Sequence, residues 1–118
     1  TVPVSIGSDL ETCRLAVKPF LALYVGGMGA KGKNFYFDLA CRYGFEAGAN
    51  QVQELYMQGK KMEAAFAVPD GLVDEIALVG SRERVAERLQ AWKASPITTL
   101  NLSLLDLESL RTMAELAL

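Results

Sequence analysis

The sequence contains no histidine among its 118 residues. Catalytic systems of the Ser-His-Asp and Cys-His types need an imidazole as the base, so the sequence excludes both. Histidine is also the commonest metal ligand, and two cysteines, Cys13 and Cys41, do not make a zinc site by themselves. We therefore predict no metal site, and the sequence identifies no general acid or base.

Long apolar runs, a secretory signal and a strong charge of one sign are also missing. No apolar run approaches the roughly 20 residues that span a bilayer, and residues 1–8 lack a basic start followed by an apolar stretch. The formal net charge is only -2, and neither half of the chain is basic enough to suggest a nucleic-acid face. We expect a cytoplasmic protein with reduced thiols and without nucleic-acid or membrane partners.

Two segments show the alternation of a β-strand. Residues 2–6 alternate and end at Gly7, although Pro3 fits only at the start or edge of a strand. Residues 97–104 place three leucines (Leu100, Leu102 and Leu104) on one side and small polar residues on the other. Because an isolated pair of strands is marginal in water, we expect both to belong to a larger parallel sheet, each followed by a helix.

Helical spacing dominates the rest of the chain. We predict a helical region over residues 9–78, interrupted at Pro19, the glycine-rich loop, Gly44, Gly59 and Pro69, and two further helices over residues 82–94 and 107–117. The predicted N-caps are Asp9, Asn34, Ser81 and Asp106. The predicted buried face of the last helix consists of Leu107, Leu110, Met113, Ala114 and Ala117.

The glycine-rich segment at residues 26–34 is open to two interpretations. Residues 27–34 nearly match the phosphate loop of P-loop NTPases, with residues 21–25 as the preceding strand and Lys33 as the phosphate lysine. The position that must supply a hydroxyl to Mg²⁺ is an amide, Asn34, and Lys18-Pro19 before the segment suits a kinked helix better than a strand. The second interpretation of residues 26–34 assigns them no ligand: they form a helix C-cap followed by a solvated turn.

The same region carries a family resemblance. Residues 18–36, which read KPFLALYVGGMGAKGKNFY, resemble a block of the luciferase-like flavin and deazaflavin oxidoreductases, especially the coenzyme F420-dependent group of actinobacteria. Further similar pieces are RYGFE at residues 42–46, LYMQGK at 55–60 with EAA at 63–65, ALVGS at 77–81 with ERV at 83–85, and TTLN at 98–101. The resemblance covers nearly the whole chain in order.

This resemblance implies the C-terminal part of a (β/α)8 barrel, of the α/β class, with residues 2–6 as the seventh strand and 98–104 as the eighth. It implies hydride transfer between coenzyme F420, or FMN as the alternative, and a small organic substrate. Since 118 residues are too few for a barrel, we expect a fragment that is inactive alone and part of a homo-oligomeric enzyme. The cofactor supplies the redox chemistry, and the protein supplies orientation and electrostatics.

Candidate site residues follow from position and charge. In a barrel the chemistry lies at the carboxyl ends of the strands, which would place residues 7–9 and 103–106 at the mouth; for Asp9 and Asp106, however, helix capping is the better interpretation. The loop is the candidate contact for the anionic tail of the cofactor, because glycines permit close approach, lysines add positive charge and a helix N-terminus attracts anions. Its members are Gly26, Gly27, Met28, Gly29, Lys31, Lys33 and Asn34.

Four aromatic residues, Phe35, Tyr36, Tyr43 and Trp92, are candidates for a substrate pocket. Phe35, Tyr43 and Trp92 each lie on an apolar stripe, which favours a place in the core. Tyr36 lies off the stripe and is therefore the candidate substrate contact. Two other classes of function remain alternatives here: a helical interaction or oligomerisation module, and a degenerate P-loop protein that binds nucleotide through residues 27–34.

Overall fold

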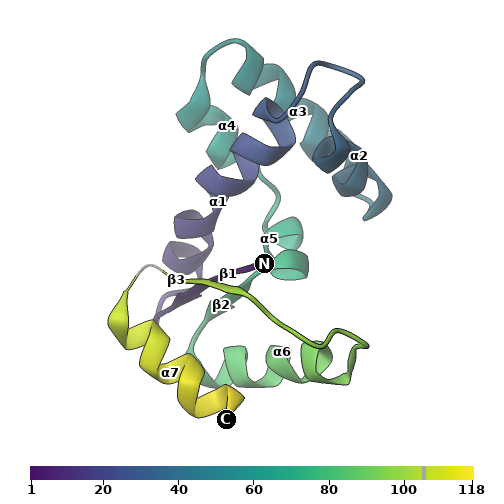
Figure 1. Ribbon diagram of the computed structural model, residues 1–118. Coiled ribbons are helices and arrows are strands. Elements are labelled where there is room, and N and C mark those ends of the chain that lie inside the picture. The colour runs from purple at the N-terminus through teal and green to yellow at the C-terminus, as the bar shows by residue number, and fades with distance from the viewer. Residues whose placement is uncertain (105) are drawn as a thin grey trace. The chain divides into compact units, whose positions relative to one another are not determined.

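The computed structural model describes residues 1–104 and 106–118, so Leu105, which falls in the predicted mouth segment 103–106, lies outside the described residues. Figure 1 shows the chain of short strands and helices. The described residues form two compact units: unit 1 comprises residues 1–16 and 76–118, and unit 2 comprises residues 17–75. The division falls inside the first helix, α1 (Leu10–Gly27).

A parallel three-stranded sheet forms the centre of unit 1. Its strands are β1 (Val2–Ile6), β2 (Leu78–Gly80) and β3 (Leu102–Leu104), in the order β2-β1-β3. β1 pairs with β2 from Val4↔Leu78 to Ile6↔Gly80, and with β3 from Val2↔Leu102 to Val4↔Leu104. The predicted parallel α/β arrangement is therefore confirmed, and the strand predicted over residues 2–6 has the predicted bounds.

One strand was not predicted, and another is shorter than predicted. β2 begins at Leu78, the last residue of the segment predicted as helical (residues 9–78), and the strand predicted over residues 97–104 is confined to Leu102–Leu104. Leu78 and Val79 are both fully buried, so β2 lacks the alternation by which a half-exposed strand is recognised. In a closed barrel of successive β/α units, strands that follow one another in the chain lie side by side in the sheet. Here β2 and β3 are consecutive in the chain, but β1 lies between them. Closure into a barrel stays a prediction.

Pro3 is tolerated in the central strand because of where β2 begins. Backbone N–H groups along β1 point alternately to its two neighbours: Val2 N donates to Asn101 O at 2.7 Å, and Gly7 N donates to Gly80 O at 2.9 Å. Position 3 would direct its N–H towards the β2 side, where pairing starts only at Val4. The missing donor of proline therefore costs no ladder hydrogen bond.

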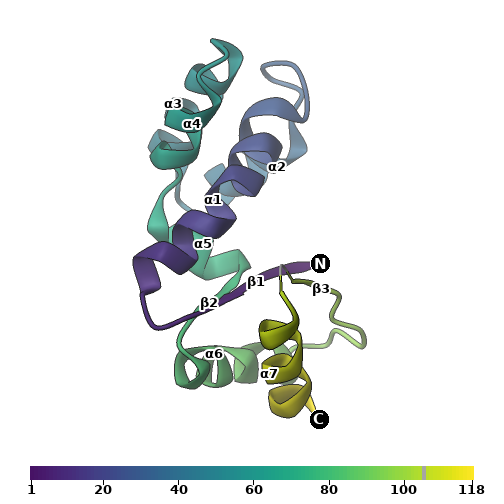
Figure 2. The same cartoon turned by 90° about the vertical axis from the view of Figure 1, so that its left-hand side faces the viewer.

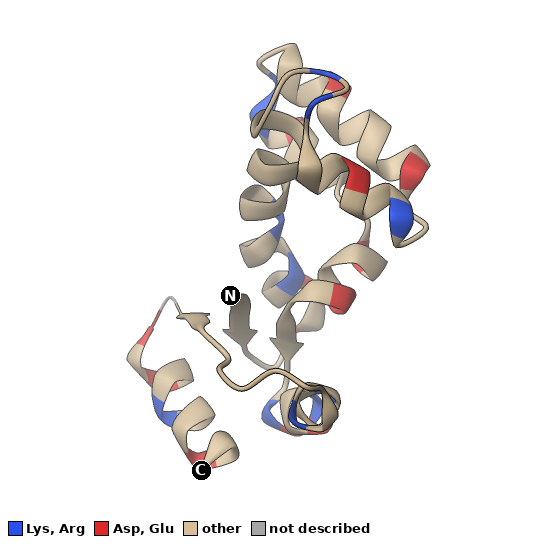
Figure 3. Ribbon diagram, turned by 45° about the vertical axis from the view of Figure 1, so that its right-hand side comes forward, with Lys and Arg blue, Asp and Glu red and all other residues tan. Residues whose placement is uncertain are grey.

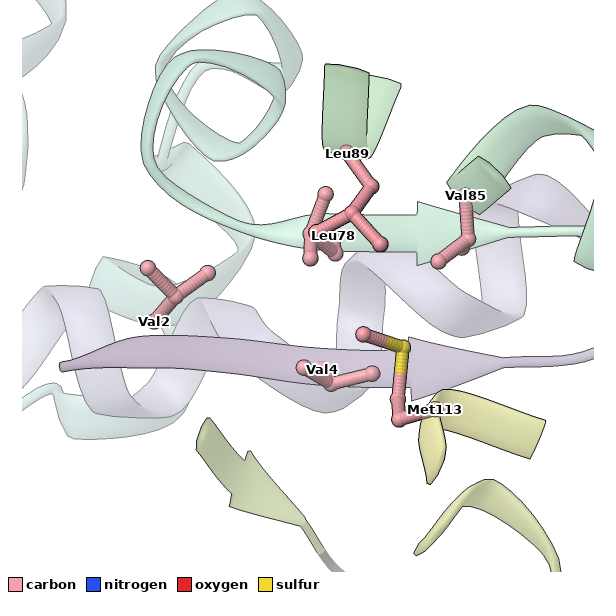
Figure 4. Close-up of a cluster of buried hydrophobic side chains, with 6 residues drawn as sticks. All are labelled: Val2, Val4, Leu78, Val85, Leu89 and Met113. Atoms are coloured by element: carbon pink, nitrogen blue, oxygen red, sulfur yellow. The ribbon is translucent and has the colours of Figure 1, made fainter. Parts of the chain in front are cut away.

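One face of the sheet packs against α6 (Arg82–Ala94) and α7 (Leu107–Ala117). Figure 4 shows the side chains that meet there: Val2, Val4, Leu78, Val85, Leu89 and Met113. Leu100, Leu102 and Leu104 pack at the margin of this cluster, whereas Thr99, Asn101 and Ser103 are exposed. The predicted apolar and polar sides of this segment are confirmed, and the apolar side faces the helices, as in a barrel wall.

The predicted inner face of the last helix was wrong in part. Met113 is buried as predicted, but Leu107 and Leu110 are 70% and 49% exposed, and Ala114 and Ala117 are exposed as well. The buried side of α7 instead carries Ser109 and Met113, with Leu116 partly buried against the core. Several leucines on one helix define more than one apolar stripe, and the pattern alone does not select which stripe packs.

All regular secondary structure in unit 2 is helical. The unit contains α1 from Val17 onward, α2 (Phe35–Arg42), α3 (Glu46–Met57), α4 (Lys61–Ala67) and all of α5 (Asp70–Ile76) except its last residue. The predicted helices are confirmed here, but the interruption predicted at Pro19 was wrong, because α1 continues through this residue as one helix. Figure 2 shows α3 and α4 lying side by side, in agreement with their packing. Lys18 on α1 is buried and forms an ion pair with Asp70 of α5 at 2.6 Å.

Candidate functional site

The carboxyl edge of the sheet is the first place where a barrel would hold its chemistry. Asp9 follows β1; its Oδ1 accepts from Glu11 N at 3.2 Å, and its Oδ2 accepts from Thr12 Oγ1 at 2.7 Å. Asp106 accepts from Ser109 N at 2.7 Å and from Ser109 Oγ at 2.9 Å. Both carboxylates therefore cap helices, which confirms the capping interpretation, and each accepts these hydrogen bonds from its own turn.

These caps make the stability of unit 1 sensitive to acid. The hydroxyl of Thr12 and neighbouring backbone N–H groups lower the pKa of Asp9 from 3.8; the backbone N–H and then the hydroxyl of Ser109 lower the pKa of Asp106 from 3.8. A pKa that folding lowers contributes stability that is complete above the unfolded value and is lost as the pH falls through the folded value. We therefore expect the urea midpoint of unit 1, followed by Trp92 fluorescence, to fall as the pH drops below about 4.

The matched variant is Asp106→Asn, because asparagine caps a helix about as well as aspartate but does not titrate. Its urea midpoint should be close to that of the parent at pH 7 and should fall less steeply than the parent's between about pH 4 and pH 2. Parallel acid dependences of the parent and the variant would show that the Asp106 cap does not contribute.

The second place is the loop between α1 and α2, which lies wholly in unit 2. Its end is fixed by Asn34, which is only 1% exposed. The Asn34 Oδ1 accepts from Tyr36 N at 2.9 Å and Phe37 N at 3.0 Å, as predicted for an N-cap. The Nδ2 donates to Tyr24 O and Val25 O, both at 3.0 Å. One side chain thus satisfies orphan N–H groups of α2 and orphan carbonyls in the last turn of α1.

This arrangement overturns the P-loop alternative. Residues 21–25 belong to helix α1, whereas a phosphate loop requires a strand before it. The side chain at the position of the Mg²⁺ ligand, Asn34, is buried and already makes four hydrogen bonds. The N–H groups of Tyr36 and Phe37 already donate to Asn34 Oδ1, so they are not available to an anion. The first turn of α2 therefore has fewer free N–H groups for anion binding than a helix N-terminus normally provides.

Gly26 and Gly27 allow α1 and α3 to pack closely. A Cβ added at Gly26 would lie 2.5 Å from the Cβ of Tyr56, and one added at Gly27 would lie 2.5 Å from the Tyr56 Cε1. Gly26 itself is buried. These two glycines therefore have a packing role that the sequence alone did not indicate, whereas their predicted role beside a cofactor stays a prediction.

The other predicted loop residues are exposed. Gly29 has a φ of 156°, and a Cβ there would lie 2.5 Å from the backbone oxygen of Lys33, so this position needs glycine. Met28, Lys31 and Lys33 are all exposed, and neither lysine side chain forms an ion pair within the part of the chain that the structure describes. Figure 3 shows basic and acidic residues interspersed along the chain rather than gathered by sign.

An aromatic row adjoins the loop. The ring centroids of Phe20 and Tyr24 lie 4.5 Å apart, those of Tyr24 and Tyr36 lie 4.7 Å apart at 86°, and those of Phe35 and Tyr36 lie 5.4 Å apart at 87°. Tyr36 is 40% exposed, as its position off the stripe suggested, and its role as a substrate contact stays a prediction. The prediction that Phe35 and Tyr43 lie in the core was wrong, because they are 61% and 50% exposed.

The reason for this error is that α2 is short and packs through its small residue. Ala40 is the one buried residue within α2, and the helix contacts α3. Phe35 instead packs edge-on against Tyr36, with the Arg42 guanidinium 6.0 Å from its ring centroid. Trp92, by contrast, is partly buried against the core of unit 1, which agrees with its stripe.

The two thiols do not offer a nucleophile. Cys13 is buried, and both cysteines are free, as predicted. Burial, followed by the nearby carboxylates of Glu46 and Asp38, raises the pKa of Cys41 above its ordinary value. A raised pKa keeps this thiol protonated at neutral pH, so it is a poor nucleophile.

The sequence reasoning missed the polar side of α3. The loop residue Lys31 and five residues of α3 and its C-cap line a pocket of about 310 Å³: Asn50, Gln53, Glu54, Met57 and Gln58. Gln53 is buried on α3 beside Ala49 and Val52. A glutamine at a buried position of an amphipathic helix was the available signal, because buried amides need hydrogen-bond partners.

Comparison with known proteins places these features in a family. The sequence profile of the luciferase-like monooxygenases matches residues 1–99. The chain belongs to this family. This luciferase-like chain is 37% identical over 116 residues to a proposed coenzyme F420-dependent oxidoreductase of Mycobacterium tuberculosis. That match covers 98% of the chain and 33% of the relative, so the chain spans about a third of the relative's length. No solved structure matches the luciferase-like chain.

The family resemblance inferred from residues 18–36 is therefore confirmed. The luciferase-like chain has no helix, among those described, that is long and apolar enough to cross a membrane. Its described residues also contain no group of three or more histidine, cysteine, aspartate or glutamate side chains arranged to hold a metal ion.

Proposed function

We propose that this chain is the C-terminal part of a luciferase-like (β/α)8-barrel oxidoreductase that transfers hydride between coenzyme F420 and a small organic substrate. The observation that carries the proposal is the family match over residues 1–99, together with the relative that is named for coenzyme F420. The parallel sheet, with α6 and α7 on its apolar face, supports a barrel wall. FMN is the alternative cofactor; the homo-oligomeric state and cytoplasmic location remain predictions.

The loop suits the anionic part of such a cofactor. Lys31 and Lys33 are exposed on a short loop held at its end by Asn34, and their ammonium groups are not committed to ion pairs within the described residues. Gly29 keeps the backbone of this loop free of side-chain bulk. In this proposal Lys31 and Lys33 bind the anionic tail, and Asn34 is a positioning residue whose side chain does not touch it.

The bound coenzyme would supply the hydride chemistry, and this part of the chain would supply binding and orientation. Tyr36 presents an exposed edge of the aromatic row, which offers an apolar surface and a hydroxyl to the substrate. No group described here is assigned a proton-transfer step, because Asp9 and Asp106 are engaged as caps.

The test is a titration of the complete enzyme with coenzyme F420, with FMN in parallel. We expect Lys31→Ala/Lys33→Ala to weaken coenzyme F420 binding by about tenfold, because two cation–anion contacts are lost. The difference should shrink at high salt, since exposed charges are screened. The control is Lys60→Ala, a single exposed lysine outside the loop, which should leave the dissociation constant unchanged.

The possible outcomes separate the parts of the proposal. An unchanged dissociation constant in the double variant would remove the loop from the cofactor site and leave the enzyme class standing. Tighter binding of FMN than of coenzyme F420 would replace the cofactor. A complete enzyme that binds neither would overturn the proposed function.

A further inference from the structure

The outward side of α2 carries apolar side chains at helical spacing. Phe35, Leu39 and Tyr43 follow one another at intervals of four residues, which places them on one side of the helix. Phe35 and Tyr43 are exposed and Leu39 is half-buried, whereas the buried Ala40 lies on the side that packs within unit 2. The stripe of Phe35, Leu39 and Tyr43 therefore faces outward, although its composition is typical of a buried helix face.

The aromatic row continues this apolar surface onto α1. Tyr36 lies beside Phe35, with ring centroids 5.4 Å apart, and contacts Tyr24 of α1, whose ring lies 4.5 Å from that of Phe20. A fully buried aromatic side chain covers about 150–250 Å², so the exposed parts of Phe20, Phe35, Tyr36 and Tyr43 amount to roughly 400 Å². A patch of this size on a monomer is often an interaction site.

Two charges of opposite sign lie on the same outward side of α2. Asp38 and Arg42 are one turn apart, and both are exposed. The Arg42 guanidinium lies 6.0 Å from the ring centroid of Phe35, so it stays on the outward side. Neither Asp38 nor Arg42 forms an ion pair with any residue in the described parts of the chain. Because the two charges cancel, this face does not select a partner of one sign, such as a nucleic acid or an anionic membrane surface.

The order of the two charges fits a second copy of the same helix in antiparallel orientation. A two-fold axis that crosses α2 at the level of residue 40 places residue 38 of each copy opposite residue 42 of the other. Both resulting pairs join an aspartate to an arginine, and the same axis brings the two apolar stripes into contact. A parallel pair of helices would instead place the charged edge of one copy against the apolar edge of the other. The sequence of α2 is therefore self-complementary only in the antiparallel arrangement.

We propose that the outward face of α2 is the contact surface of a two-fold symmetric dimer of this chain. Asp38 of each copy pairs with Arg42 of the other, beside an apolar centre formed by Phe35, Leu39 and Tyr43 of both copies. About 400 Å² per copy is small for a protein interface, so we expect a dissociation constant on the order of 10–100 μM. The proposal does not rest on the coenzyme or on hydride transfer; it assigns a surface to the predicted homo-oligomer.

The experiment mixes two charge-reversal variants of the 118-residue chain. Asp38→Arg leaves two cations on the face and Arg42→Asp leaves two anions, so each variant alone brings like charges together across the axis. By sedimentation velocity, we expect each alone to dimerise at least about tenfold more weakly than the parent. In an equal mixture, with one variant fluorescently labelled, both pairs regain opposite charges. The mixed dimer should therefore form with an affinity within about threefold of the parent's.

Controls separate this contact from other causes of association. Glu63→Arg reverses an exposed charge on α4 of the same unit and should leave the dimerisation constant within about twofold. Phe35→Ser removes part of the apolar stripe without a change of charge and should weaken dimerisation about tenfold. The signs of Asp38 and Arg42 also suit the two ends of α2, so circular dichroism at 222 nm is used to verify that each variant keeps its helices.

Three results would overturn the proposal. A parent chain that stays monomeric well above the expected dissociation constant would show that α2 does not join two copies. Equal association of the parent and both single variants would place the contact elsewhere, for example at an open edge of the sheet. A mixture that associates no better than the separate variants would exclude the antiparallel pairing. None of these results bears on coenzyme F420 binding, which is measured separately with the double lysine variant.

Discussion

Asn34→Ala is expected to destabilise unit 2 by about 2–4 kcal/mol. The substitution removes the N-cap of α2, which is typically worth about 1 kcal/mol, and leaves the carbonyls of Tyr24 and Val25 without their donor in a buried place. The measurement is urea unfolding followed by circular dichroism at 222 nm, to which the helices of both units contribute, with Trp92 fluorescence following unit 1 separately. Because the same side chain fixes both ends of the loop, the ordering of the loop should be lost as well.

Two further variants test this explanation. Asn34→Asp keeps an acceptor for the N–H groups of α2 but turns a second oxygen towards two carbonyls, so it should lose most of the same stability. Asn50→Ala removes an exposed asparagine whose Nδ2 donates to Glu46 O, and it should change stability by no more than about 0.5 kcal/mol. A loss below about 1 kcal/mol for Asn34→Ala would contradict the double-cap role.

Gly26→Ala should destabilise unit 2 by about 1–3 kcal/mol, the usual cost of overpacking. Glycine to alanine inside a helix normally gains up to about 1 kcal/mol, so the expected sign is opposite to that of helix propensity. The cause is the new Cβ, which would lie 2.5 Å from the Tyr56 Cβ and 2.8 Å from its Cγ. Urea unfolding followed by circular dichroism measures the difference.

Double-mutant cycles with Tyr56→Ala distinguish the packing contacts of Gly26 from those of Gly27. The atoms that a Cβ at Gly27 would meet all belong to the Tyr56 ring, whereas the nearest atom to a Cβ at Gly26 is the Tyr56 Cβ, which alanine retains. In the Tyr56→Ala background, Gly27→Ala should therefore be neutral or stabilising and Gly26→Ala should remain destabilising. Equal behaviour of the two substitutions in that background would show that close packing is not the reason for the glycines.

The sequence was most informative where the interaction is local. Asp9, Asn34, Ser81 and Asp106 all accept from backbone N–H groups two or three residues further along, as their positions predicted. Such hydrogen bonds depend on the residue and its turn, not on the rest of the fold. The inward face of α6, with Val85 and Leu89 buried, was predictable for a similar reason: the helix has a single apolar stripe.

The candidate site was only partly predictable. The loop was found from its glycines and lysines, but the roles within it depend on contacts with distant residues. Glycine is required at position 26 because of its contact with Tyr56, thirty positions further along the chain. The pocket beside the loop is completed by Gln53 of α3. No local rule brings these partners together, because α3 reaches the loop only through the packing of α1, α2 and α3.

The residue pattern by itself determined the family, the parallel α/β class, the helix starts and the loop that separates α1 from α2, since each of these is written in neighbouring residues. The tertiary structure decided which of two apolar stripes of α7 is buried, that Leu78–Gly80 forms a strand, and that Phe35 and Tyr43 face outward. Burial depends on what lies opposite a side chain, and that partner comes from a remote part of the chain.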